Sequence, residues 1–526
     1  MSLKLICKNP ATGEVLRELD PTPAERIPEL FMRARNAQIL WAALPPKKRA
    51  ERLKQIRETL LNHADELIEL IAKENGKPRL EALSSELLPS LELLTYFAKK
   101  GPGILRDTPL PLRLMKHRKS YLNRFPYGVV AILSPWNYPF LLPFSDIMLA
   151  LLAGNSVIFK PSERAPLVGL RIQELCDESG LPQNLLQTVI GDDSLGAAIV
   201  TANRAAGTGG PDKVFFTGNI ENGKKVLRAA AETITPVSLE LGGKNAIIVL
   251  PDADIEYATS AIVWGAFTNS GQVCAATSRA FVHEKIIDAV TARVSEKLAS
   301  LRRAPSARYD NDLGPITLES QKTIYSKQLD EARSRGATIV CGGNFSEDKA
   351  FLEPTVLRAQ DTAGLSVFTD ETFGPILAIS SFKSPAEAVE KANHSHYGLT
   401  ASIITKNLSL GEEIAKQLHV GTVMLNEVVY TAGLPEVPWG GVKQSGIGRT
   451  HSECGLLEFV NSRHIHKPRS RLFIFKSLWW FPYTPHQFMV FRKFAELYRN
   501  HWTDKIRAFP HFLIHLVHFL KREKRL

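Results

Sequence analysis

The stretch SVIFKPSERAPLVGLRIQELCDESG (residues 156–180) joins an apolar, strand-like run to a helical segment that covers residues 165–180. Similar apolar runs occur as GVVAIL (128–133), KVFFT (213–217) and NAIIVL (245–250). Strands that alternate with helices predict a parallel sheet with helices on both faces. We therefore expect an α/β fold.

The same alternation extends away from this stretch in both directions. Residues 51–78 repeat apolar side chains at helical spacing, and Gly76 and Pro78 provide a helix stop. Residues 112–133 change to shorter alternating segments, which predicts strands or a hairpin. A second alternating section follows residue 274, and its expected strands are ATIVCGG (337–343), ILAIS (376–380) and GTVMLN (421–426).

Length and composition are those of a globular protein with more than one lobe. The chain has 526 residues, of which 44% are hydrophobic and 23% charged. Its five cysteines are far apart and odd in number, which argues against a disulfide framework or zinc module and for a reducing compartment. The first residues lack the pattern of a secretory signal, and no apolar stretch is long enough to span a bilayer. These features predict a cytoplasmic protein.

The net charge of +11 is concentrated near the C-terminus. Residues 470–526 contain 11 Lys and Arg against 3 Asp and Glu, so this stretch carries +8 of the total. The preceding part is nearly neutral. This distribution weakens a nucleic-acid-binding interpretation and favours contact of one segment with an anionic surface.

Three residues together suggest acyl transfer. Cys274 ends the stretch NSGQVC, in which Gly271 allows a tight turn, so the Cys274 backbone N–H can face a substrate oxygen. Glu240 ends an apolar strand, where partial desolvation would raise its pKa toward the range of a general base. Asn137, in SPWNYPF, carries an amide that can donate to an oxyanion.

Each of these residues also has a purely structural interpretation. A single cysteine is often a small core residue. Glu240 can be a sheet-end carboxylate paired with Lys244, and an asparagine among prolines is first a turn residue. The chemistry is favoured by their occurrence together with further motifs.

Seven motifs, in family order and at compatible spacing, resemble the aldehyde dehydrogenase superfamily over about residues 5–465. They are PWNYP (135–139), GNSVIFKPSE (154–163), FTG (216–218), LELGGKN (239–245), NSGQVC (269–274), ETFGPI (371–376) and PWGGVKQSGIGR (438–449).

The resemblance implies a mechanism. Cys274 is the nucleophile, and Asn137 with the Cys274 backbone N–H holds the oxyanion. A hydride passes to a nicotinamide, which leaves a thioester, and Glu240 activates the water that hydrolyses it. Relatives that transfer the acyl group to coenzyme A usually lack this glutamate, so Glu240 implies a free carboxylic acid as product.

The resemblance also implies an adenosine and pyrophosphate site. Lys160 and Glu163 match positions that hold the adenosine ribose hydroxyls. Gly218 and Gly223 follow a strand and are expected near the pyrophosphate. Asn219 departs from the serine that the family usually has there, which predicts an altered affinity. A carboxylate at Glu163 would repel a 2′-phosphate, so NAD is the expected cofactor, with NADP left open.

At the other end of the cofactor, Glu371 and Phe373 match contacts to the nicotinamide ribose and ring. Without the resemblance, they would be interpreted as a loop carboxylate and a core aromatic. The resemblance places four further residues in the cofactor site: Pro135, Trp136, Ser162 and Leu241.

The implied architecture has a Rossmann-like cofactor domain, an α/β catalytic domain and a β arm for oligomerisation. The expected boundaries are 1–108 and 129–240 for the NAD(P)-binding domain, 241–454 for the catalytic domain, 109–128 and 455–467 for the arm, and 470–526 for a C-terminal extension. The arm is expected to join a homodimer or homotetramer.

The C-terminal extension contains 14 Phe, Trp and Tyr residues in 57 positions. Pro510 is expected to start a helix of about ten largely apolar residues, followed by a basic cluster, which fits peripheral contact with an anionic membrane. The alternative is a packed extension over the substrate entrance or a neighbouring subunit. His511, His515 and His518 share a helical face, but no carboxylate or cysteine completes a set of ligands, so we expect no metal.

The substrate expected from the extension is an apolar aldehyde of medium or long chain, by analogy with fatty-aldehyde members of the family. The competing hypothesis is a semialdehyde dehydrogenase of the succinic semialdehyde type, for which Arg279 or Arg449 would clamp the distal carboxylate. A catalytically silent scaffold protein and a nucleic-acid-binding tail are the remaining alternatives.

Overall fold

The computed structural model describes residues 4–202, 209–303, 311–347, 350–474 and 477–523. The chain divides into two compact units, one formed by residues 1–106 and 124–462 and the other by residues 107–123 and 463–526.

The first sheet of the larger unit contains the strands predicted at 128–133, 156–160 and 213–217. Its strand order is β17-β9-β8-β5-β6-β7, and all neighbours are parallel except β17, which runs antiparallel to β9. The strands are β5 (Val129–Leu133), β6 (Ser156–Lys160), β7 (Leu186–Thr188), β8 (Lys213–Thr217), β9 (Val237–Glu240) and β17 (Gly446–Ile447). The helices between them are α6 (Leu141–Ala153), α7 (Pro166–Glu178), α8 (Asp193–Thr201) and α9 (Ile220–Ala231).

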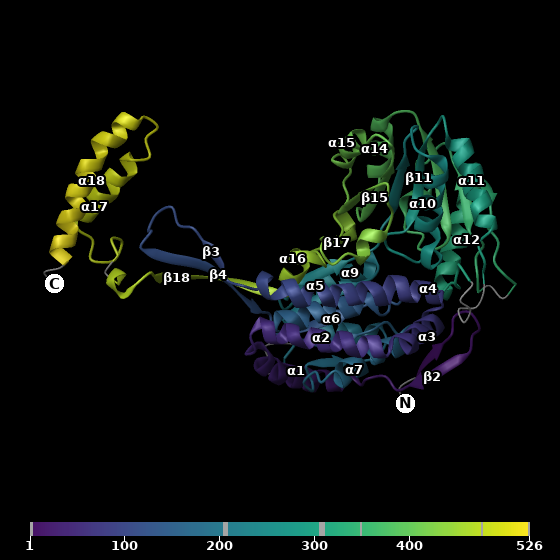
Figure 1. Cartoon of the computed structure of the whole chain (residues 1–526), viewed down its shortest axis with the longest axis horizontal. Coiled ribbons are helices and arrows are strands. Elements are labelled where there is room, and N and C mark those ends of the chain that lie inside the picture. Colours follow the sequence, from purple (N-terminus) through teal and green to yellow (C-terminus); the bar gives the residue numbers. More distant parts are fainter. Residues whose placement is uncertain (1–3, 203–208, 304–310, 348–349, 475–476, 524–526) are drawn as a thin grey trace. The chain divides into compact units, whose positions relative to one another are not determined.

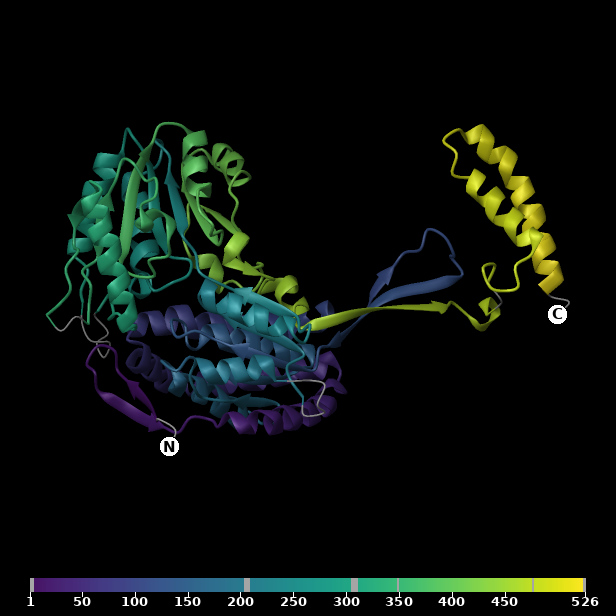
Figure 2. The same cartoon turned by 180° about the vertical axis from the view of Figure 1, so that it is seen from behind.

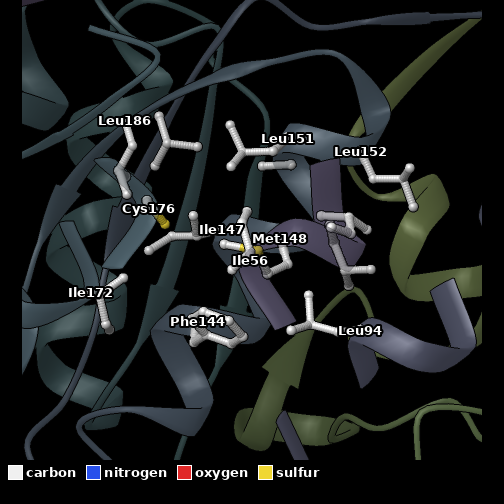
Figure 3. Packing of buried hydrophobic residues seen from close by; sticks show 14 of the residues in the cluster. Ile56, Leu94, Phe144, Ile147, Met148, Leu151, Leu152, Ile172, Cys176 and Leu186 are labelled. Carbon is white, nitrogen blue, oxygen red and sulfur yellow. The ribbon is translucent and has the colours of Figure 1, made fainter. Parts of the chain in front are cut away.

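Both faces of this sheet are buried, as the apolar character of its strands predicts. Alternate residues of β5 enter two different cores: Val130 and Ile132 pack on one face, and Val129 and Ala131 on the other. Figure 3 shows the first core, in which Ile147 and Met148 of α6 lie among residues of neighbouring helices. The expected α/β class, with helices on both faces of a parallel sheet, is confirmed.

The second sheet also lies in the larger unit. Its order is β12-β13-β14-β11-β10-β15-β16, and only β12 is antiparallel to its neighbour. The strands are β10 (Asn245–Val249), β11 (Thr277–His283), β12 (Thr338–Cys341), β13 (Thr355–Arg358), β14 (Ile376–Phe382), β15 (Thr400–Ile404) and β16 (Thr422–Leu425). Its helices are α10 (Ile255–Phe267), α11 (Ile287–Ala299), α12 (Glu319–Ser334), α13 (Ser366–Thr369), α14 (Pro385–Asn393) and α15 (Leu408–Ala415). Helix α16 (Ser452–Leu457) instead packs against α6 of the first sheet.

The helical pattern expected over residues 51–78 forms two helices. They meet at His63, and the second ends at Gly76, whose φ of 91° is left-handed. Glycine adopts this conformation without steric cost, so the predicted stop is confirmed. The N-terminal elements are β1 (Leu5–Lys8), β2 (Val15–Leu19), α1 (Ile27–Ala42), α2 (Pro46–Asn62), α3 (Ala64–Asn75), α4 (Arg79–Ala82), a π-helical turn (Leu83–Leu87) and α5 (Leu88–Ile104).

The smaller unit contains a three-stranded sheet and a helical hairpin. The strand order is β18-β4-β3, with β3 (Thr108–Leu110), β4 (Arg118–Pro126) and β18 (Val460–Pro468). The hairpin expected near 109–128 is the antiparallel pair β3–β4. Part of the segment expected as a strand at 455–467 is helical instead, because α16 extends to Leu457.

Helices α17 (Pro485–Glu496) and α18 (Trp502–Glu523) pack side by side in the C-terminal extension (Figure 2). The expected helix start at Pro510 is wrong, because α18 begins eight residues earlier and passes through this proline. A proline inside a helix leaves the carbonyl four residues before it without its usual donor. That carbonyl belongs to Ile506, which is exposed, so water can satisfy it.

No helix among the described residues is long and apolar enough to cross a membrane. Likewise, no cluster of His, Cys, Asp or Glu in the described part of the chain has the arrangement of a metal site. The basic cluster expected at 521–526 lies outside the side chains that the structure describes.

Candidate active site

The candidate catalytic residues lie where the two sheets of the larger unit meet. Lys160 and Glu240 end strands β6 and β9, and Gly218 follows β8, so they lie at the carboxyl edge of the first sheet. This edge is where open α/β sheets bind ligands. Cys274 and Glu371 precede strands β11 and β14 of the second sheet. A cavity of about 640 Å³ is lined by all five residues.

The loop before the nucleophile has an unusual backbone. Asn269, Ser270 and Gly271 have φ values of 48°, 55° and 70°. Left-handed conformations are strained for residues other than glycine and occur often at functional sites. A Cβ at residue 271 would lie 2.2 Å from the Gly374 carbonyl oxygen, so only glycine fits this turn. The tight turn predicted at Gly271 is therefore present.

Asn137 is buried just before α6, and its side chain faces the nucleophile loop. Its Nδ2 donates to the Gln272 carbonyl at 3.0 Å. This bond fixes the orientation of the amide and leaves its second N–H available. Both Asn137 and Cys274 line the cavity. The amide and the thiol thus share one cavity, as stabilisation of an oxyanion beside the thiol would require.

Glu240 is buried at the end of β9. Its Oε1 has no hydrogen-bond partner among the described residues. A Cβ at Gly440 would lie 2.8 Å from this oxygen, so the glycine leaves room for it. Burial, and then the nearby Asp146 carboxylate, hold the pKa of Glu240 well above its ordinary value, against the opposing charge of Arg449. A raised pKa is what a carboxylate base needs near neutral pH.

The Cys274 thiol is half-buried at the cavity wall. Burial raises its pKa to about 12, and the Glu371 and Glu240 carboxylates add to this effect. The thiol is thus protonated in the free protein, and a base must remove its proton before attack. Asn245 holds the cysteine in place, because its Nδ2 donates to the Cys274 carbonyl at 2.8 Å.

Most of the predicted cofactor residues line the same cavity. Lys160 reaches it from β6, and burial lowers the pKa of its ammonium group. Glu371 is held by the Gly243 backbone N–H at 3.0 Å, and burial raises its pKa to about 7. The predicted residues that line the cavity are Pro135, Trp136, Lys160, Ser162, Glu163, Gly218, Asn219, Leu241, Glu371 and Phe373.

Phe373 is held in a strained position at one end of the cavity. Its φ is 53°, and its carbonyl accepts a bond of 2.7 Å from the Tyr325 hydroxyl. Its ring meets that of Trp136 edge to face, with centroids 5.7 Å apart. These contacts form an apolar, aromatic wall suited to a flat ring.

Gly223 and Asn219 both have structural roles in α9. Gly223 does not line the cavity, and a Cβ there would lie 2.7 Å from Leu241 Cδ2, so the glycine allows α9 to pack against the sheet. Asn219 is the N-cap of α9, and its side chain accepts from the Asn222 N–H at 2.8 Å. Asparagine and serine are both favoured at N-caps, so asparagine can take the place of the usual serine here.

Sequence reasoning missed the side walls of the cavity. Many of these residues lie on α8, on α9 and at the start of α12, and others lie at the ends of β5 and β8. Arg164 and Lys225 are the basic residues among them. The missed lining residues are Leu133, Ser134, Leu142, Arg164, Asp193, Gly196, Ala197, Val200, Phe216, Thr217, Asn222, Lys225, Val226, Ala229, Gly242, Leu318, Ser320, Gln321 and Ile324.

The two arginines considered for a carboxylate clamp have other partners. Arg279 is buried and donates to the backbone carbonyls of Lys244 and Ala392. Arg449 donates to the carbonyls of Gly441 and Gly448. Neither arginine lines the cavity.

Comparison with known proteins gives a family match. Residues 2–465 match the sequence model of the Aldehyde dehydrogenase family. A 4,4′-diapolycopene aldehyde oxidase of Methylomonas sp is 38% identical over 490 residues, which cover 93% of this chain and 90% of the relative. A putative succinate-semialdehyde dehydrogenase [NADP(+)] of Mycolicibacterium smegmatis is 35% identical, with 87% of each chain covered.

Solved structures share the fold. A betaine aldehyde dehydrogenase of Staphylococcus aureus in complex with NAD⁺ is 30% identical and superimposes with a TM-score of 0.84, covering 90% of this chain and 96% of that chain. The lactaldehyde dehydrogenase of Escherichia coli gives the same score at 30% identity, covering 89% and 96%. The NAD⁺ complex agrees with the nicotinamide cofactor predicted from the sequence.

The family match and the shared fold together define an aldehyde-oxidising enzyme. The chain belongs to the aldehyde dehydrogenase family. The expectation of an enzyme of this family is confirmed.

Proposed function

We propose that this enzyme oxidises apolar aldehydes to carboxylic acids through a thioester on Cys274. Once the Cys274 thiol has passed its proton to solvent water, its sulfur bonds to the aldehyde carbon, and the carbonyl oxygen becomes an oxyanion. The Asn137 amide and the Cys274 backbone N–H stabilise that oxyanion. Loss of hydride leaves the thioester, and Glu240 takes a proton from the water that hydrolyses it. The unpartnered, buried Oε1 of Glu240 supports this role and carries the proposal.

The cavity fits a nicotinamide dinucleotide, with NAD preferred and NADP also accommodated. Its volume lies within the range of ligand sites, and it combines the N-terminus of α9 with polar and aromatic walls. When bound, NAD(P)⁺ supplies the hydride acceptor. Lys160 and Glu163 would hold its adenosine ribose, and Glu371 and Phe373 its nicotinamide riboside. Arg164 and Lys225 offer positive charge for a 2′-phosphate, which opposes the repulsion expected from Glu163.

Two observations support an apolar substrate. The alignment with the diapolycopene aldehyde oxidase covers 93% of the chain. It must therefore extend past residue 465, where the family match ends, into the C-terminal extension. The two arginines that would suit a semialdehyde are bonded to backbone carbonyls. An aldehyde without a second charged group therefore fits better than succinic semialdehyde.

The C-terminal extension supports peripheral contact with an anionic membrane. Trp502, Ile506, Phe509, Leu513 and Val517 are at least 40% exposed and lie three or four residues apart on α18. This spacing makes one apolar stripe along the helix. Basic residues dominate the charge of the extension, and aromatic, apolar and basic side chains together suit a membrane interface.

The β arm is proposed to join subunits. We assign the cofactor domain to residues 1–108 and 129–240, the catalytic domain to 241–454 and the arm to 109–128 and 455–467. Strands β3, β4 and β18 form the small sheet of that arm, and sheet edges of this kind can pair with another chain. A homodimer or homotetramer is the expected assembly, measurable by sedimentation.

A series of aldehydes tests the proposal. Straight-chain aldehydes from propanal to hexadecanal, together with succinic semialdehyde, would be compared by kcat/KM with NAD⁺ and with NADP⁺. We expect kcat/KM to increase with chain length, and to be higher with NAD⁺ than with NADP⁺. A preference for succinic semialdehyde would contradict the apolar substrate without affecting the thioester mechanism.

A further inference from the structure

One short segment contacts both loops that carry the catalytic groups. It extends from Asn75, at the end of α3, to Glu86 in the π-helical turn, and we name it the 75–86 clamp. Helices α3 and α4, which carry its first part, belong to the larger unit together with α6 (Figure 1). The left-handed Gly76 turns the chain inward, and a Cβ there would lie 2.6 Å from Pro315. The next residue, Lys77, is thereby directed into the interior.

Lys77 is a buried cation at the centre of the clamp. Its side chain is fully buried, as is that of Glu86, and Nζ lies 2.6 Å from Glu86 Oε1. Nζ also donates to the Asn137 carbonyl at 2.9 Å and lies 3.9 Å from the ring centroid of Tyr138. A buried lysine is costly unless it is paired. Here Lys77 contacts Asn137 and Tyr138 directly, and its partner Glu86 binds the backbone that follows them.

The remaining clamp residues fix the ends of the same loops. Glu86 Oε2 accepts from the Phe140 and Leu141 N–H groups at 2.8 and 3.0 Å. Asn75 Nδ2 donates to the Trp136 carbonyl at 2.7 Å. On the nucleophile loop, Glu81 accepts from the Asn269 N–H at 3.0 Å. The backbone on both sides of Asn137 is therefore held by side chains from one segment.

We propose that Lys77 is a positioning residue for the oxyanion donor, acting through the backbone of Asn137. Bonded to Glu86 and to the Asn137 carbonyl, Lys77 sets the position from which the Asn137 amide reaches the substrate oxygen. Oxyanion stabilisation depends on such placement, because a donor contributes only when it is aimed at the developing charge. This inference rests on the proposed role of Asn137 in the thioester mechanism.

The test is the pre-steady-state burst of NADH with hexanal and NAD⁺ in the full chain. Asn137→Ala should lower the burst rate by about a hundredfold or more, and Lys77→Met by about tenfold or more. In a protein that already carries Asn137→Ala, the added change Lys77→Met should lower the burst rate by less than about threefold. The reason is that Lys77 acts through the amide that Asn137→Ala removes. The dissociation constant for NAD⁺ should stay within about twofold in Lys77→Met.

Controls separate positioning from loss of stability. Lys77→Met leaves Glu86 as an unpaired buried charge, so Lys77→Met/Glu86→Gln removes both charges and should show the same slow burst. Arg49 is also a buried cation that donates to backbone carbonyls, including that of Leu152 at 2.8 Å, and it does not contact the catalytic loops. Arg49→Met should keep the burst rate within about twofold.

Two results overturn the inference while leaving the thioester mechanism intact. One is a normal burst in both Lys77 variants when Asn137→Ala is slow. The other is a fold-loss of burst rate in Asn137→Ala/Lys77→Met that equals the product of the fold-losses in Asn137→Ala and Lys77→Met. A normal burst in Asn137→Ala would instead contradict the proposed role of Asn137 itself.

Discussion

At the scale of single residues, burial shapes the acid–base behaviour of the two reactive groups. Burial raises the pKa of the Cys274 thiol to about 12 and holds that of Glu240 well above its ordinary value. Each carboxylate near the thiol further disfavours the thiolate. A neutral thiol is less reactive toward chance oxidants, and removal of its proton becomes part of the catalytic cycle.

Removal of the thiol tests the nucleophile. Cys274→Ala should lower NADH formation by at least about a thousandfold, because no other cysteine lines the cavity in the described part of the chain. Cys454, an exposed cysteine, provides the matched control, and Cys454→Ala should keep normal activity. Substantial NADH formation by Cys274→Ala would exclude the thiol from the mechanism.

The raised pKa of Glu240 predicts the direction of the pH dependence. The base form of a carboxyl is the deprotonated one, so a raised pKa moves its appearance to higher pH. We expect kcat to increase with pH above the ordinary titration range of a glutamate, because the base form appears only at that higher pH. This increase should be absent in Glu240→Gln. An identical pH profile in that variant would assign the titration to another group.

At the scale of elements, the nucleophile loop depends on one glycine. Gly271→Ala combines a φ of 70° with a Cβ placed 2.2 Å from the Gly374 carbonyl oxygen. We expect this change to lower the free energy of unfolding by more than about 3 kcal/mol, and to slow the NADH burst.

Gly13 is a control with a similar φ but no atoms close to the position of a Cβ. Its φ is 72°, and no atom lies within 4 Å of the position of its Cβ. Gly13→Ala should cost only about 1 kcal/mol of unfolding free energy and leave activity unchanged. Chemical denaturation measures both effects, and equal losses at the two glycines would argue against a steric restriction at Gly271.

Local patterns predicted the elements that depend on local forces. The apolar strands β5, β6, β8 and β10 were expected because runs of buried side chains identify them. The break at His63 and the continuation of α18 through Pro510 were not expected. Both depend on packing between helices, which spacing along the chain does not reveal.

The site shows the same difference between local and long-range information. Asn137, Glu240 and Cys274 were found because they lie in short motifs. Lys77 was not found, because its importance comes from Asn137, sixty residues away along the chain. The walls formed by α8 and α9 were missed for a similar reason, since ordinary small side chains line a cavity only after the sheet has formed.

At the scale of the whole molecule, the catalytic unit is joined to an extension with a different surface. The body is nearly neutral, whereas the extension is basic and exposes Trp502, Ile506 and Phe509 on α18. Exposed aromatic stripes of this kind are uncommon on proteins without a binding partner. An anionic lipid surface matches both the charge and the apolar stripe.

Changes in that stripe should affect membrane binding and leave the chemistry intact. Trp502→Ser/Phe509→Ser should weaken binding to vesicles of anionic phospholipid at least about tenfold, with normal oxidation of propanal. Leu40 is exposed in the larger unit and offers a control, since Leu40→Ser should bind vesicles normally. Sedimentation with vesicles measures the effect. Equal binding by all three proteins would contradict the proposed membrane contact.

The thioester itself can be observed directly. Glu240→Gln should still form it but hydrolyse it about a hundredfold or more slowly. Mass spectrometry of this variant, quenched after mixing with hexanal and NAD⁺, should show one added hexanoyl group on the peptide that contains Cys274. Formation of NADH without any acyl group on Cys274 would contradict the mechanism.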